Sequence, residues 1–167
     1  MARFKTLYLL CAVSSVAVTP ARALHWPAET LRSLQTQSGL FRIVLVGTGN
    51  QLWVGGNMVR ELDTSGASVA AQWPPDGPPR FILLDLPTGG GSCSDLFRLL
   101  DLTPGKKPYL TGTFNGCPAN PSLSVDGDNV AIDFAGTRKQ RAVIWRYDAA
   151  RRRLHDPRHG AVTGPLL

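Results

Sequence analysis

Short apolar runs separated by turn-forming residues recur along this chain, and they constrain its fold more than any other feature. The runs at 41–46, 81–86 and 96–102 are each followed closely by glycine or proline. They are rich in aliphatic, β-branched and aromatic residues, and turn signals return about every ten residues, as in antiparallel sandwiches and small barrels. The sequence therefore predicts a mainly β protein, folded as an antiparallel β-sandwich or a small β-barrel.

The clearest local signal is a hairpin over residues 121–134. Apolar and polar residues alternate on both sides of Asp126-Gly127, which is a typical two-residue hairpin turn. A turn at these two residues would place Leu123 opposite Val130 and gather the apolar side chains on one face. The side chains expected to be buried together are Leu123, Val125, Val130, Ile132 and Phe134.

A short helix is expected before the first strand, over residues 24–39. Pro27 suits the first helical turn, and apolar residues follow it with helical spacing. Gly39 is a residue that commonly ends a helix, and the apolar period changes directly after it. The expected fold is therefore a β domain with one short N-terminal helix.

The first 23 residues have the pattern of a cleavable secretory signal peptide. Arg3 and Lys5 precede an apolar stretch over 7–18, and Ala21-Arg22-Ala23 matches the signal-peptidase pattern, so cleavage is predicted after Ala23. The apolar stretch is shorter than the roughly 20 residues that a membrane span needs. We therefore expect a periplasmic or extracellular protein with no transmembrane segment after signal removal.

Removing the signal would also change the charge and the domain limits. It takes away three of the 18 basic residues and none of the 12 acidic residues, which leaves a net charge of +3 in place of +6. A chain of this length forms one domain. The expected organisation is a signal peptide over 1–23, a single β-rich domain over 24–155 and a poorly ordered basic tail over 156–167.

Two cysteines, Cys93 and Cys117, would remain in the exported chain. An isolated pair in an oxidising compartment most simply forms a structural disulfide. The chain has no Cys-x-x-Cys motif, which argues against a thioredoxin-like redox site. We therefore predict one Cys93–Cys117 disulfide, which would stabilise the fold by roughly 3–4 kcal/mol.

The motifs that suggest catalysis or metal binding are all incomplete. The segment 62–68 resembles the Asp-Thr-Gly nucleus of aspartic proteases, but Ser65 is inserted before the glycine. His155 and His159 have a metal-ligand spacing, yet Pro157 between them disfavours a helix. We expect no catalytic residue, no metal and no cofactor. One alternative stays open, a small cell-envelope hydrolase that uses carboxylates or a terminal histidine.

Basic residues are concentrated toward the C-terminus. Residues 138–167 carry eight basic side chains and two acidic ones, whereas 24–137 has a net charge of −3. Arg151, Arg152 and Arg153 are consecutive, so we expect them to be exposed near the end of the last hairpin. A solvated edge explains such a segment, and the alternative is a surface for an anionic partner, which makes these arginines candidate partner-binding residues.

These observations favour a small exported, non-catalytic binding protein. An inhibitor or immunity-type module that recognises an unknown protein or an anionic envelope component would have this size and composition. Nucleic acid is a poor candidate partner because the chain is expected to be exported. No motif in the sequence is specific enough to indicate a family.

Overall fold

The computed structural model describes residues 28–62, 64, 66–87, 96–115, 121–136, 141–156 and 160–162. These residues form strands β1 to β14 in three antiparallel sheets and contain no helix. The first sheet consists of β1 (Glu29–Thr36), β2 (Gly39–Val46), β3 (Gly49–Val54) and β4 (Asn57–Leu62). The central sheet consists of β5 (Ser68–Trp73), β6 (Phe81–Leu86), β7 (Leu96–Asp101), β8 (Tyr109–Leu110) and β9 (Phe114–Asn115). The third sheet consists of β10 (Ser122–Asp126), β11 (Asn129–Phe134), β12 (Val143–Asp148), β13 (Arg153–Asp156) and β14 (Gly160–Val162).

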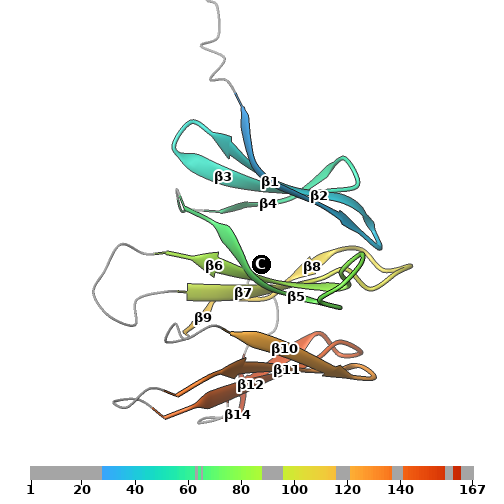
Figure 1. Ribbon diagram of the computed structural model, residues 1–167, viewed down its shortest axis with the longest axis vertical. Helices are drawn as coiled ribbons and strands as arrows, with labels where there is room; N and C mark the ends of the chain where they lie inside the picture. The colour runs from blue at the N-terminus through green and yellow to red at the C-terminus, as the bar shows by residue number, and fades with distance from the viewer. Residues whose placement is uncertain are drawn as a thin grey trace, which may run out of the picture.

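The three sheets stack face to face in chain order, with the central sheet between the other two (Figure 1). The first and third sheets are meanders in which each strand pairs with the next, and both β8 and β9 pair with β7 in the central sheet. The prediction of a mainly β, antiparallel fold is therefore confirmed, and its sheets form three layers.

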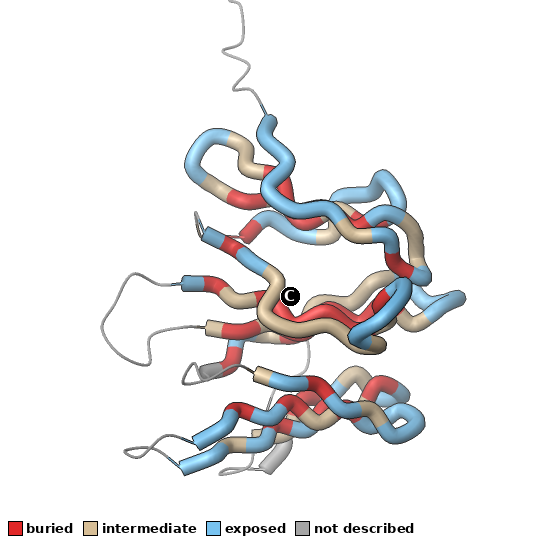
Figure 2. The backbone as a smooth tube through the Cα atoms, viewed as in Figure 1, coloured by how far each residue is buried: buried red, intermediate tan, exposed pale blue. Residues whose placement is uncertain are grey.

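The central sheet is buried on both faces, and it separates two hydrophobic cores. Along β6, Phe81 and Leu83 point toward the third sheet, whereas Ile82 and Leu84 point toward the first. All four side chains are fully buried. Figure 2 shows buried segments in all three layers of the stack. Strands that are buried on both faces carry continuous apolar runs, which explains the sequence of β6. The fold therefore depends on one sheet that supplies side chains to two cores.

The expected N-terminal helix over 24–39 is wrong, because residues 29–36 form β1, an edge strand that pairs with β2. A helix would place Leu31 and Leu34 on one face. In the strand, Leu34 packs against the core between the first two sheets while Leu31 stays 42% exposed. Gly39 does not end a helix but follows a two-residue turn at a φ of +103°, where glycine is favoured.

The predicted hairpin over 121–134 is confirmed, but its turn lies one residue later. Val125 pairs with Val130 and Leu123 with Ile132, so Gly127 and Asp128 form the turn. The shift preserves the alternation of faces, and the expected apolar side chains lie on the core side. Asp128 is held at the turn because its carboxylate accepts a hydrogen bond from Arg80 at 2.9 Å.

Some strands differ from those expected, and some predictions concern residues that the structure does not describe. Residues 109–115 contain two short strands, β8 and β9, and β5 was not expected. Within the predicted tail, Gly160–Val162 forms β14 and pairs with β13. The predicted signal peptide and both Cys93 and Cys117 lie outside the described residues.

Candidate binding site

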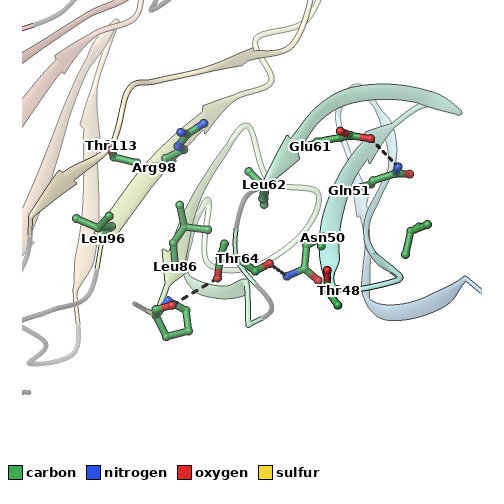
Figure 3. Close-up of a pocket in the computed structure, with 13 residues that line it drawn as sticks. Thr48, Asn50, Gln51, Glu61, Leu62, Thr64, Leu86, Leu96, Arg98 and Thr113 are labelled. Atoms are coloured by element: carbon green, nitrogen blue, oxygen red, sulfur yellow. Dashed lines mark hydrogen bonds between the residues drawn. The ribbon is translucent and has the colours of Figure 1, made fainter. Parts of the chain in front are cut away.

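A pocket of about 1070 Å³ opens at one side of the molecule, between the first and central sheets. In Figure 3, Gln51 and Glu61 lie on one side, Arg98 and Thr113 lie on the other, and Leu62 lies between them. The pocket forms here because β2 and β4 end, and β3 begins, beside the connection that leads to β5. The described residues that line it are Val46, Thr48, Gly49, Asn50, Gln51, Glu61, Leu62, Thr64, Leu86, Pro87, Leu96, Arg98 and Thr113.

Arg98 is the cation of the pocket, and a rigid element holds it there. It lies in β7, between Phe97 and Leu99, which are buried in the core against the third sheet. Because side chains alternate along a strand, Arg98 points to the opposite face, toward the first sheet. Its side chain therefore projects from the middle of the stack into the pocket, where it is half-buried.

Hydrogen bonds fix the connection between β4 and β5 along the pocket wall. The side-chain amide of Asn50 donates to the carbonyl oxygen of Thr64, and the Thr64 hydroxyl donates to the carbonyl oxygen of Pro87 at 3.4 Å (Figure 3). Asn50 is only 1% exposed, and its Oδ1 has no hydrogen-bond partner among the described residues. Buried amide oxygens usually accept a hydrogen bond, so Asn50 Oδ1 makes this part of the pocket wall a polar site.

The rim of the pocket carries an ordered chain of polar side chains. Trp53 Nε1 donates to Gln51 Oε1 at 3.2 Å, and Gln51 Nε2 donates to Glu61 Oε1 at 3.1 Å. Gln51 and Glu61 are direct neighbours across β3 and β4, which places both on the same face. Leu62 points toward the central sheet, so the neighbouring Glu61 lies at the rim on the opposite face of β4, and its carboxylate is turned toward Gln51 and not toward Arg98 (Figure 3).

The described lining combines polar and apolar groups. It offers donors and acceptors around an apolar floor that includes Leu62, Leu86 and Leu96. Among these residues Glu61 is the only carboxylate, and none is a histidine, serine or cysteine.

The three arginines predicted as partner-binding residues have three different environments. Arg151 is exposed and pairs with Asp148 at 2.7 Å. Arg152 has a φ of +54°, lies over the ring of Tyr109 at 5.1 Å and donates to the carbonyl oxygen of Lys107 at 2.7 Å. Arg153 is exposed at the start of β13. The expectation of three exposed arginines is therefore wrong for Arg152, which joins two turns of neighbouring sheets.

The turn that contains these arginines also sets the ionisation of Asp148. The backbone N–H of Arg151 and then its guanidinium donate hydrogen bonds to this carboxylate, and they lower the pKa of Asp148 below its ordinary value. The charge of Arg151 is therefore already paired with a carboxylate of the protein itself. An anionic partner would have to compete with Asp148 for Arg151.

The remaining histidine and metal candidates do not converge in the described part of the chain. His155 lies in β13 beside Arg146 and Ala161 of the neighbouring strands. His25 and His159 lie outside the described residues. The residues that the structure describes contain no group of three or more histidine, cysteine, aspartate or glutamate side chains that could hold a metal ion.

Two important polar residues were visible in the sequence only as interruptions of an apolar run. Arg98 and Asp101 break the run of β7. In the structure Arg98 lines the pocket, and Asp101 is 1% exposed and accepts a hydrogen bond from Tyr147. A charged residue inside a strand that is otherwise apolar was therefore the signal for both.

Known protein families, curated proteins and solved structures yield no match to this chain. Across the described residues, no helix has the length and apolar character needed to cross a membrane.

Proposed function

We propose that this chain is a small exported, non-catalytic binding protein of the periplasm or extracellular space. It recognises a protein or an anionic envelope component, in the manner of inhibitor and immunity-type modules. The observation that carries the proposal is the pocket between the first and central sheets, which has hydrogen-bonding walls and an apolar floor. Binding sites commonly combine an apolar lining with a few well-placed polar groups.

Arg98 is the residue that we expect to contact an anionic group of the partner. Its backbone lies in a strand that is buried on both faces, so little backbone freedom is lost when a partner is bound. Arg151 and Arg152 lie at the turn before β13, outside the pocket. The pocket combines its cation with an apolar floor and hydrogen-bonding walls, which makes it a better candidate for recognition than the arginine run.

The test is capture of partners from the cell envelope by the exported protein. Arg98→Gln removes the cation of the pocket, and Glu61→Gln removes the rim carboxylate with little change in shape. Glu61 is exposed, so its substitution should leave the fold intact even where Arg98→Gln weakens it. The matched control is the double variant Arg151→Ser/Arg153→Ser, which removes two exposed charges outside the pocket.

The outcomes separate the two surfaces. Loss of a captured partner with the pocket variants, and its retention with the double arginine variant, would support the pocket. The reverse pattern would assign recognition to the arginine run. Absence of any partner for the folded wild-type protein would contradict a binding function, and Glu61-dependent hydrolysis of an envelope substrate would favour the hydrolase.

A further inference from the structure

The outer face of the first sheet is a surface that no described strand covers. The first sheet is an end layer of the stack, and its opposite face forms the core with the central sheet (Figure 1). The side chains on the outer face alternate along the strands with those core residues. The exposed or half-buried residues of this face include Leu40, Arg42, Trp53, Met58 and Glu61.

The two end layers of the stack differ in character. On the first sheet, Leu40 is 44% exposed and Met58 is 50% exposed, although both are large apolar side chains. On the third sheet, one outward row across the strands runs from Ser124 through Arg146 to His155. The outer face of the third sheet exposes one large apolar side chain, Ile144. The outer face of the first sheet is therefore the more apolar of the two end faces, which favours it as the contact surface.

The composition of the outer face matches that of protein interfaces. Tryptophan, methionine and arginine are enriched at interfaces and lysine is depleted, and this face holds Trp53, Met58 and Arg42 but no lysine. Trp53 is held in place by its hydrogen bond to Gln51. A fixed aromatic side chain loses little rotational freedom on contact, which favours its use as an anchor.

The charges on this face are arranged so that the face can pair with itself. Arg42 pairs with Trp53 across β2 and β3, whereas Glu61 pairs with Gln51 across β3 and β4. The two opposite charges therefore flank β3 on either side. A two-fold axis that lies between the two sheets and crosses β3 obliquely, midway between Gln51 and Trp53, would set Arg42 of each copy opposite Glu61 of the other.

We propose that two copies of this protein associate through the outer faces of their first sheets. The sheets would pack face to face, as the three sheets of one copy already do. The first sheet has four strands of six to eight residues. It therefore presents about 500 Å² in projection. Stable interfaces bury about 800 Å² per partner, so the dimer should be reversible and depend on protein concentration.

The test is sedimentation velocity of the exported protein over a concentration series from micromolar to several hundred micromolar. The wild type should shift from monomer to dimer across the series, and Trp53→Ser and Met58→Ser should each stay monomeric. Ile144→Ser is the matched control, because Ile144 is 41% exposed on the outer face of the third sheet. It should dimerise like the wild type.

Charge reversal makes the test specific for the proposed pairing. Arg42→Glu and Glu61→Arg should each weaken dimerisation by about tenfold, and the double variant should restore it. Circular dichroism would confirm that each variant is folded. A wild type that stays monomeric throughout, or a dimer that neither Trp53→Ser nor the single charge reversals weaken, would overturn the proposal.

Discussion

Tyr147 of the third sheet donates a hydrogen bond to Asp101 of the central sheet, with 3.0 Å between the two oxygens. Both residues are 1% exposed, and the other carboxylate oxygen of Asp101 accepts hydrogen bonds from the backbone N–H and the hydroxyl of Thr103. A buried carboxylate needs such partners, because an unsatisfied polar group in a core is costly. This contact therefore fixes the position of one sheet against the next.

Tyr147→Phe should lower the free energy of unfolding by roughly 1–3 kcal/mol, because it deprives the buried Asp101 of one donor. Urea denaturation at neutral pH would measure the loss. Tyr109→Phe is a suitable control, because it also removes a tyrosine hydroxyl but at a side chain that is only half-buried. A loss no larger than that of the control would mean that the hydrogen bond contributes little.

The same tyrosine predicts how stability changes in alkaline solution. Burial, and then the neighbouring Asp101, raises the pKa of Tyr147 above its ordinary value of 10.0. Above that pH the unfolded chain loses the phenol proton while the native protein keeps it, so the free energy of unfolding should fall as pH rises. Denaturation at a series of pH values should show this decline, and it should be shallower in Tyr147→Phe.

Arg152→Ser should destabilise the protein by about 1–2 kcal/mol, because it removes a contact with the Tyr109 ring and a hydrogen bond to Lys107. Arg153→Ser, at an exposed neighbouring position, should change stability by no more than about 0.5 kcal/mol. Thermal or urea unfolding of the two variants would compare them. Equal effects would show that Arg152 does not join the turns in solution.

Gly39→Ala should destabilise the protein more than Gly56→Ala. Both glycines have a positive φ, so alanine at either site should cost about 1 kcal/mol in backbone strain. A Cβ at Gly39 would also lie 3.0 Å from the Cα of Gly55, whereas one at Gly56 would have no atom within 4 Å. Urea denaturation of both variants isolates the effect of this close approach, and equal losses would contradict it.

Export and oxidation of the chain can be checked on one preparation from the cell envelope. Intact mass should correspond to a chain that begins at Leu24, and alkylation without reductant should label neither Cys93 nor Cys117. Retention of residues 1–23, or lipid on Cys11, would contradict the predicted cleavage. Free thiols would contradict the disulfide, whose removal should otherwise cost roughly 3–4 kcal/mol.

Elements whose signals are local were predictable from the sequence. The hairpin of β10 and β11 follows from alternation around a glycine-containing turn, although Asp126-Gly127-Asp128 permits two turn positions and the contact of Asp128 with Arg80 is needed to choose between them. The β1 strand was missed because proline before and glycine after a segment suit a helix as well as a hairpin. Pairing with β2 decides that case, and it is not a local property.

The candidate site could not be predicted in the same way. Its walls come from β3, β4, β7 and the segment before β9, and no short motif records that these parts meet. Arg98 was visible as a charge within an apolar run, but its meaning depends on which sheet covers that face of β7. Predicting the pocket would therefore have required the order in which the three sheets stack.

The central strand β6 has a further consequence for how the fold is specified. In an ordinary amphipathic strand, a slip of one residue would expose the apolar side chains, so alternation alone protects the register. Ile82, Leu83 and Leu84 make both faces of β6 apolar, so a strand that slipped by one residue would still present aliphatic groups to both cores. The face to which each side chain of β6 points must therefore be determined near the ends of the strand, where Phe81 pairs with Asp101 and Asp85 pairs with Phe97. The most deeply buried strand of the protein thus takes its alignment from its partners and not from its own pattern.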